Sequence, residues 1–372
     1  MILYISVFVI TLIMSAYVGR ERTAVAVPGA KTADRLFMAM IFVVLFAVSA
    51  LRVNTGNDYT MYINKFHDAY YDYYVVTEPG FNMVVKGVYS FLTKENYIVV
   101  FAIFAFVTIA MFLKGIYDQA DNFAYSYFFF MAFGIFFQSL NTVRNYLALA
   151  LVVYSMKYVI DRKYVRFILC VLLAALFHKS ALIVIPLYIA AALIHRFWQV
   201  AAVCVLFATG LIFSKQYMAI MLKLYPSYST EEAYLMGTAV SLVNIGRCVL
   251  VLLLGIVFYR KYIKEDRAMR FYFYCNLFAT LIYCCFSFVP FLSRLGYYLN
   301  ITQIFLIPNL IVRMEKGRLR QIITVCAIAF GILYFAAFLY KAQDVYIKIL
   351  PYRTWLNDSN IEFAPVLPIS LW

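Results

Sequence analysis

The stretch 52–62 gathers side chains that could do chemistry, in a chain where only 13% of the residues are charged. It contains Arg52, Gly56, Asp58, Tyr59 and Tyr62. Asp58 could be a general base that deprotonates a hydroxyl group close to an arginine-bound anion, or it could pair with Arg52 and brace the loop. Gly56 would permit the tight turn that the general-base arrangement needs. The residue types alone leave both roles of Asp58 open.

Three arginines stand at the ends of apolar segments. Arg144 lies at the predicted start of a helix, where unpaired backbone N–H groups favour anions. Arg52 and Arg294 occupy comparable ends of other apolar segments. Any one of them could simply extend its charge to the lipid headgroups. Because a guanidinium group can bind phosphate through two parallel hydrogen bonds, the three together predict a site for a lipid that carries a diphosphate.

His178 and Arg247 are two further candidates. His178 lies between two apolar runs, where it could serve as a general base or merely satisfy local hydrogen bonds. The sequence does not decide whether Asp58 or His178 is the base. Arg247 lies midway along the apolar run 238–259. Charges at membrane depth are costly and usually face an internal cavity, so Arg247 is a fourth candidate ligand of the diphosphate.

The composition defines the class of protein that must position these residues. Hydrophobic residues make up 65% of the 372-residue chain, whereas a soluble domain is nearer half apolar. The net charge of +14 comes from basic residues in short loops between apolar runs, a pattern of membrane proteins rather than of nucleic-acid binders. All seven cysteines lie inside apolar runs without a C-x-x-C pair, so neither disulfides nor zinc are indicated.

Several motifs are absent from the sequence, which contains no Walker A motif, no G-x-G-x-x-G and no H-E-x-x-H. The predicted outer loops contain no D-x-D metal pair. We therefore expect neither a metal nor a cofactor, and neither ATP-driven transport nor the use of nucleotide sugars. The first 18 residues lack a basic start and a small-residue cleavage site, so we expect a retained transmembrane helix rather than a signal peptide.

The apolar runs predict an all-α polytopic membrane protein with about 12 transmembrane helices, forming a single integral membrane domain over 1–372. The runs lie near 2–18, 36–51, 96–113, 123–138, 143–160, 164–177, 180–194, 198–214, 238–259, 271–290, 295–312 and 321–340. Basic residues cluster in the loops 19–35, 157–166, 260–270 and 313–320. The positive-inside rule places all four loops in the cytoplasm, and twelve crossings achieve this with both termini outside.

The same number of crossings decides how two ambiguous segments are placed. The segment 79–92 must not cross, so we expect an interfacial or re-entrant helix at the outer face. The segment 164–194 must turn at 178–180 instead of forming one long helix. The outer face then carries the loops 52–95 and 214–237 and the tail 341–372. This topology places the candidate residues at the outer ends of crossings: Arg52, Asp58, Arg144, His178 and Arg294.

The stretch Arg52-x3-Gly56-x-Asp58-Tyr59-x2-Tyr62-x3-Phe66 resembles the signature loop of the EpsG family, whose members are Wzy-type polysaccharide polymerases. Further similar stretches follow in order along the chain: Glu78-Pro79-x-Phe81, Arg144-x3-Ala148, Ala174-x2-Phe177-His178-x-Ser180-Ala181, Arg294-x2-Tyr297-Tyr298, Ile307-Pro308 and Pro351-Tyr352. Two positions depart from the pattern: Asn57 stands where threonine is expected, and Asn145 where glutamine is expected.

The resemblance implies a metal-independent glycosyltransferase that polymerises oligosaccharide repeat units carried on undecaprenyl diphosphate. It would work at the outer face of the bacterial cytoplasmic (inner) membrane and make an O-antigen, exopolysaccharide or capsule, with a chain-length regulator as a candidate partner. His178 and Asp58 would be the catalytic candidates, and Arg52, Arg144, Arg247 and Arg294 the diphosphate ligands. The candidate substrate-contacting or loop residues are Gly56, Tyr59, Tyr62, Asn145, Lys179, Tyr297 and Tyr352.

Two other functions fit the sequence less well. A flippase or secondary transporter of lipid-linked oligosaccharides would tend to show two repeated halves with broken helices at matching positions, and no such halves are visible in the sequence. A ligase-type transferase that uses the same donor with a different acceptor is barely distinguishable from a polymerase.

The basic loops generate a prediction about membrane orientation. We expect a cysteine at position 65 to react with a membrane-impermeant reagent in spheroplasts, and a cysteine at position 316 to react only after the membrane is opened, because basic loops stay in the cytoplasm. A parent without native cysteines serves as the control. Labelling of position 316 but not of position 65 in closed spheroplasts would overturn the orientation.

Overall fold

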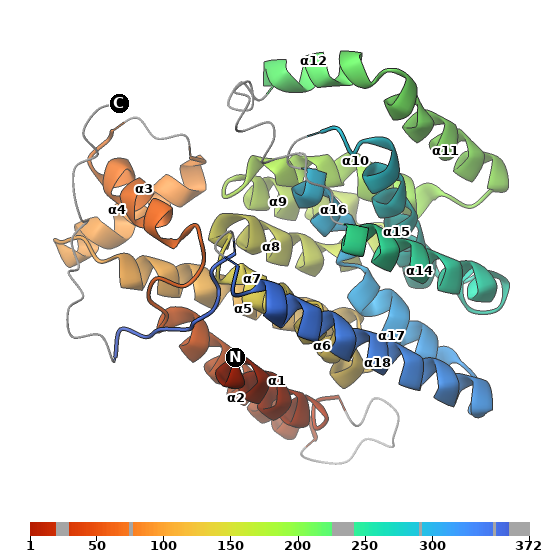
Figure 1. Cartoon of the computed structure of the whole chain (residues 1–372), viewed down its shortest axis with the longest axis horizontal. Helices are drawn as coiled ribbons and strands as arrows, with labels where there is room; N and C mark the ends of the chain where they lie inside the picture. The colour runs from red at the N-terminus through yellow and green to blue at the C-terminus, as the bar shows by residue number, and fades with distance from the viewer. Residues whose placement is uncertain (20–29, 74–76, 225–241, 290–291, 345–346, 357–372) are drawn as a thin grey trace. The chain divides into compact units, whose positions relative to one another are not determined.

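The computed structural model describes residues 1–19, 30–73, 77–224, 242–289, 292–344 and 347–356. In these ranges the chain is helical, with no β-strand and with one isolated antiparallel bridge between Arg52 and Thr354 (Figure 1). The chain forms two compact units. Unit 1 comprises 1–154, 172–179 and 316–372, and unit 2 comprises 155–171 and 180–315.

Each apolar run of the sequence corresponds to one helix or to two consecutive helices. Unit 1 contains α1 (Ile2–Ser15), α2 (Ala30–Ala50), α3 (Tyr59–Tyr70), α4 (Pro79–Leu92), α5 (Tyr97–Gln119), α6 (Phe123–Ala132), α7 (Ile135–Ser139) and α18 (Arg318–Lys341). Unit 2 contains α10 (Val184–Leu193), α11 (Phe197–Ile212), α12 (Ser214–Leu224), α14 (Leu242–Phe258), the π-helical turn η3 (Tyr259–Ile263), α15 (Arg267–Cys285), α16 (Leu292–Asn300) and α17 (Gln303–Arg313). Both units include parts of α8 (Val143–Ile160) and α9 (Tyr164–Ala175), and the 3₁₀ helix η1 (Lys179–Ile183) begins where they join. The prediction of one domain over 1–372 is not tested by this division, because the units share helices.

Six helical segments in the described part of the chain are long and apolar enough to cross a membrane: 32–50, 97–119, 143–160, 242–263, 295–313 and 318–341. The pair α11–α12, bent by 85°, would make a seventh. The protein is therefore all-helical and polytopic in character, but twelve crossings are not confirmed. Among the described residues, four further apolar helices are too short to span a bilayer core of about 30 Å alone: Ile2–Ser15, Phe123–Ala132, Tyr164–Ala175 and Lys179–Leu193. Helix α15 has 19 residues but is not among the six segments. Gly134, at a φ of +72°, separates α6 from α7 inside one run.

The two ambiguous segments fold as helices of the expected extent. Helix α4 begins and ends where predicted, and it buries Gly80, Phe81, Val85 and Tyr89 on one face. Its position in a membrane stays a prediction. The turn near 178–180 is confirmed, because Phe167 and Tyr188 stack with their ring centroids 6.0 Å apart. In one continuous helix, 21 residues would separate them by about 31 Å.

Three of the four basic loops share one end of unit 2. Arg162 of the loop 157–166 lines the same small cavity as Arg267 and Arg270 of the loop 260–270. The latter loop also reaches the start of the loop 313–320, through ion pairs of Lys261 with Glu315 and of Arg313 with Asp266, each at 2.8 Å. A common end is what the positive-inside assignment requires of these loops. Which side of the membrane this end faces stays a prediction.

In unit 1, the start of the predicted signature loop is paired with the end of the described chain. The backbone N–H of Val53 donates to the carbonyl of Arg353 at 2.9 Å, and that of Trp355 donates to the carbonyl of Leu51 at 3.1 Å. Further along, the N–H of Gly56 donates to the carbonyl of Lys348 at 2.8 Å. The segment 347–355 therefore holds the loop along most of its length.

Gly56 is required where the loop meets the start of α8. Its φ of +97° is a conformation that L-residues rarely adopt. A Cβ atom at this position would lie 2.8 Å from the Cα atom of Asn141, which is backbone and cannot move aside cheaply. The side chain of Asn141 in turn accepts a hydrogen bond from the N–H of Asp58 at 3.0 Å. Gly56 thus lets the loop dock against the residues just before Arg144, and the predicted need for glycine in this loop is explained.

We predict that Gly56→Ala lowers the free energy of unfolding by about 1–3 kcal/mol, because the new side chain adds both backbone strain and a clash. Thermal unfolding of the purified protein in detergent measures the change. Gly87→Ala, in α4, is the matched control, since its Cβ would meet no atom within 4 Å and its φ is ordinary. Equal unfolding temperatures for the two variants would contradict the prediction.

Candidate functional site

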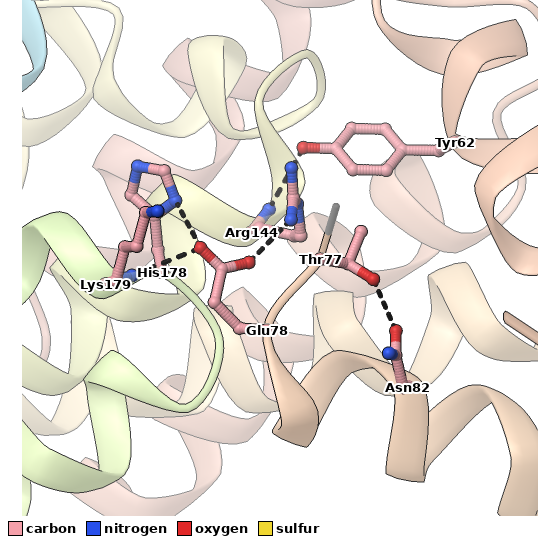
Figure 2. A network of polar contacts seen from close by, with 7 residues as sticks. All are labelled: Tyr62, Thr77, Glu78, Asn82, Arg144, His178 and Lys179. Carbon is pink, nitrogen blue, oxygen red and sulfur yellow. Dashed lines mark hydrogen bonds and ion pairs between the residues drawn. The ribbon is translucent and has the colours of Figure 1, made fainter. Parts of the chain in front are cut away.

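The side chain of Glu78 joins two of the candidates from the sequence, Arg144 and His178, in unit 1. Its Oε2 atom lies 2.6 Å from Nη1 of Arg144, and its Oε1 atom lies 3.5 Å from Nδ1 of His178 (Figure 2). The backbone N–H of Lys179 also donates to Oε1, at 3.2 Å. We call Glu78, Arg144 and His178 the charged cluster. It brings together the start of α4, the start of α8 and the turn after α9.

Local sequence explains why Glu78 points into this cluster. Glu78 is the N-cap residue of α4, in an extended conformation, and Pro79 occupies the first turn of the helix. Proline suits this position because its missing N–H would lack an intrahelical partner there anyway. The same end of the helix is held against the segment that follows α9, since the N–H of Gly80 donates to the carbonyl of Leu176 at 2.9 Å.

The cluster is largely shielded from solvent. The side chains of Glu78, Arg144 and His178 are 12–13% exposed. Burial alone would raise the pKa of the Glu78 carboxyl, but the hydrogen bonding to His178 and the charge of Arg144 outweigh burial and lower this pKa to about 2. Glu78 is therefore a carboxylate at any physiological pH, and it holds a cation on one side and an imidazole on the other.

Aromatic rings surround the guanidinium group of Arg144. Its central carbon lies 5.3 Å from the centroid of Phe81 and 5.8 Å from that of Tyr62. The hydroxyl of Tyr62 also accepts a hydrogen bond from the backbone N–H of Arg144, at 3.4 Å. Burial raises the pKa of Tyr62, with Arg144 opposing, so the phenol stays protonated. The predicted substrate residue Tyr62 is thus a neighbour of Arg144 that positions it.

Arg52 contacts another ring of the same aromatic group. It is 2% exposed, its Nη1 atom donates to both oxygens of Ser49, and its guanidinium carbon lies 4.9 Å from the ring centroid of Phe101. Phe101 in turn stacks on Tyr59 at 4.8 Å and meets Tyr62 edge-on at 6.3 Å. Arg52 and Arg144 therefore contact one continuous group of rings, and their action on a common ligand stays a prediction.

Asp58 stands at the N-cap position of α3, half-buried, with its backbone N–H bound to Asn141. Neither the predicted role as a base nor the predicted pairing with Arg52 is tested by these contacts. Tyr352 of the tail donates its hydroxyl hydrogen to the carbonyl of Val48 at 2.9 Å, so it stabilises the segment before Arg52.

The other predicted residues lie on α8, α14 and α16. Asn145 is buried on α8, directly after Arg144. Arg247 is buried on α14 at 6% exposure, and Tyr297 lies half-buried on α16, both in unit 2. Arg294 lies on α16, but its side chain is outside the described part of the structure. The joint action of these residues with the charged cluster stays a prediction.

Sequence reasoning missed the role of Glu78, which was noted only as part of a family motif. The available signal was an acidic residue directly before Pro79-Gly80 at the start of an amphipathic helix. A second signal is that Arg144 and His178, once buried, need a counter-charge, which only an acidic residue can supply. Within the described ranges, no group of three or more His, Cys, Asp or Glu residues could hold a metal ion.

The fold and the site together define a polytopic, all-helical membrane protein with a buried cluster of charges at the ends of its helices. The family model described as the EpsG family matches residues 35–354. The chain therefore belongs to the EpsG family, and the resemblance of its signature loop is confirmed. Searches among curated proteins and among solved structures find no match.

The lowered pKa of Glu78 predicts an acid-sensitive contribution to stability. The unfolded chain takes up this proton near pH 4.5 and the folded protein only near pH 2. Between these values the unfolded chain binds more protons, so up to about 3 kcal/mol of stability, present above pH 4.5, is lost as the pH falls toward 2. Thermal unfolding of the wild type and of Glu78→Gln from pH 7 to pH 2.5 measures the effect.

We expect Glu78→Gln to be less stable than the wild type at pH 7, and the two unfolding temperatures to converge in acid. Two curves that run parallel over the whole range would show that the carboxylate contributes nothing through its charge.

Proposed function

We propose that this protein is a polysaccharide polymerase, which transfers a glycan from a lipid diphosphate to a hydroxyl group of the next lipid-linked unit. Membership of the EpsG family supports a membrane protein of polysaccharide synthesis. The observation that carries the chemistry is the Glu78 carboxylate held between Arg144 and His178. It combines a cation for a phosphate group with an oriented imidazole for a proton.

His178 is the base in this proposal. Glu78 faces Nδ1 at 3.5 Å, so Nε2 is the ring nitrogen that would receive a proton. A carboxylate that orients an imidazole in this way is a common arrangement for activating a hydroxyl nucleophile. The acceptor oxygen forms a bond to the anomeric carbon, and the bond from that carbon to the diphosphate breaks. The bonding electron pair leaves with the diphosphate, and the hydroxyl proton passes to Nε2.

Arg144 would stabilise the departing diphosphate. One of its terminal nitrogens is bound to Glu78, and a guanidinium group has further N–H donors that can face a phosphate. Positive charge placed in advance where negative charge develops stabilises the transition state. Arg52, Arg247 and Arg294 would bind the rest of the lipid diphosphate. In this proposal, arginine side chains stabilise the negative charge of the leaving diphosphate.

The carrier would be undecaprenyl diphosphate, and the site would open to the outer face of the bacterial cytoplasmic membrane. These statements rest on the family and on the basic loops of the sequence. A chain-length regulator is the proposed partner protein. Asp58 is the second candidate base, at the start of α3, and the experiment below separates it from His178.

We predict that the purified protein, given lipid-linked repeat units and no nucleotide sugar, makes a ladder of longer glycans. His178→Ala should lower the initial rate by about 10²–10⁴-fold, the usual contribution of a general base, while Asp58→Asn stays within about tenfold of the wild type. Arg144→Lys should also lose most of its rate, because lysine keeps the charge but not the forked geometry.

His67→Ala is the matched control. Its Nδ1 atom pairs with Glu95 at 3.0 Å, which makes it a second histidine–glutamate pair of unit 1 that lies outside the charged cluster. We expect this variant to keep the wild-type rate. If His178→Ala polymerises as fast as His67→Ala while Asp58→Asn is inactive, the base is Asp58. If the wild type makes no ladder, the proposed function is wrong.

A further inference from the structure

Unit 2 contains a cavity with a basic end and an apolar wall. None of its lining residues belongs to the charged cluster. Helices α11 and α14 both pack on α15, and a cavity of about 820 Å³ lies among the three. This volume falls in the range of small-molecule sites. The buried side chains of Phe273 and Leu277 on α15 contribute to its wall. The cavity thus has a built apolar surface rather than being a gap between surface loops.

Close helix contacts explain how the cavity forms. Gly255 lets α14 approach α15, since a Cβ atom there would lie 2.6 Å from the ring of Phe273. Gly210 lets α11 approach the far end of α15, where a Cβ atom would lie 2.8 Å from the carbonyl of Cys285. Away from these contacts, Phe197 and Val200 on α11 and Ile256 on α14 line the cavity.

One end of the cavity is strongly basic. Arg196, Arg260 and Lys264 line it, and the single acidic lining residue, Glu265, lies 3.6 Å from Lys264. The local positive potential extends to the lining residue His195. Burial, followed by the charges of Arg270, Arg162 and Arg267, holds the pKa of this imidazole below its usual range. The basic end therefore favours an occupant that carries negative charge.

Most of the other lining residues are apolar. Phe197 is 86% exposed and Ile256 is 55% exposed, on helices whose outer faces also expose many large hydrophobic side chains. Trp198 stands at the start of α11 and Tyr259 directly after the end of α14, and amphipathic aromatic residues at helix ends mark the level of the headgroups. A molecule that fits has an anionic head of modest size joined to long apolar chains.

We propose that this cavity, between α11, α14 and α15, is a binding site for an anionic phospholipid, with the phosphate between Arg260, Lys264 and Arg196 and the acyl chains against Phe197 and Ile256. Basic pockets between transmembrane helices are known to hold anionic headgroups in this manner. A zwitterionic phospholipid offers no net charge to the basic end, so the site discriminates by headgroup charge. The lipid would stabilise the end of unit 2 at which the three basic loops meet.

Trp198, next to the cavity residue Phe197, provides a direct reporter. A Trp355→Phe/Trp372→Phe background leaves it as the only tryptophan of the three in the chain. In this background, the protein is reconstituted in phosphatidylcholine with increasing fractions of phosphatidylglycerol that carries brominated chains. Bromine quenches tryptophan at short range. We expect brominated phosphatidylglycerol to quench Trp198 at mole fractions where brominated phosphatidylcholine does not.

The charge variants test the site itself. Arg260→Gln and Lys264→Gln should each lower the preference for phosphatidylglycerol by about fivefold, the usual contribution of one basic residue at an anionic membrane. Lys261→Gln removes the same charge one residue from Arg260, but its side chain pairs with Glu315 and does not line the cavity, so we expect no loss of preference. An equal loss in Lys261→Gln, or equal quenching by the two lipids in the wild type, would overturn the proposal. Binding that follows added undecaprenyl diphosphate instead of phosphatidylglycerol would overturn it as well.

Discussion

The ionised carboxylate of Glu78 is the constraint on which the site depends. Arg144 lies at the start of α8 and His178 in the turn after α9, and each would be costly to bury without a counter-charge. One carboxylate, 2.6 Å from the guanidinium group and 3.5 Å from the imidazole, serves both. Because it also accepts the backbone N–H of Lys179, it fixes the turn that separates α9 from η1. The Glu78 carboxylate therefore offsets the cost of burying Arg144 and His178, and it also fixes the position of these two side chains relative to each other.

Around this carboxylate, aromatic rings take the place that water or further carboxylates would have in a soluble enzyme. Arg144 lies against Tyr62 and Phe81, while Arg52 lies against Phe101. Ring faces attract cations without neutralising them, so these contacts stabilise both guanidinium groups in their charged form. Only Arg144 gives up one side of its guanidinium group to an acid. The basic end of the cavity in unit 2 differs from this arrangement. There, several basic side chains line an open cavity together with one acidic residue, Glu265.

Much of the fold could be predicted from the sequence because hydrophobic runs and helix starts are local signals. The helices over 79–92 and 143–160 and the turn before Ser180 form where the sequence indicates. The number of crossings could not be settled in this way, since Gly134 breaks one run and others end as short helices. The arginines and the histidine were identifiable as rare polar residues at helix ends. Glu78 was not, because its role depends on two partners 66 and 100 residues away, and no local pattern reports such a meeting.

The bridge between Arg52 and Thr354 has a consequence for biosynthesis. The loop after α2 emerges from the ribosome early, yet its backbone partners at 347–355 are made some three hundred residues later. Helices can insert one after another as they are translated, whereas this loop has to wait for the end of the chain before its backbone donors are satisfied. The protein thus completes its signature loop last. A chain that stops short of residue 347 could still insert its helices, but the backbone groups of this loop would lack the partners that the full-length chain supplies.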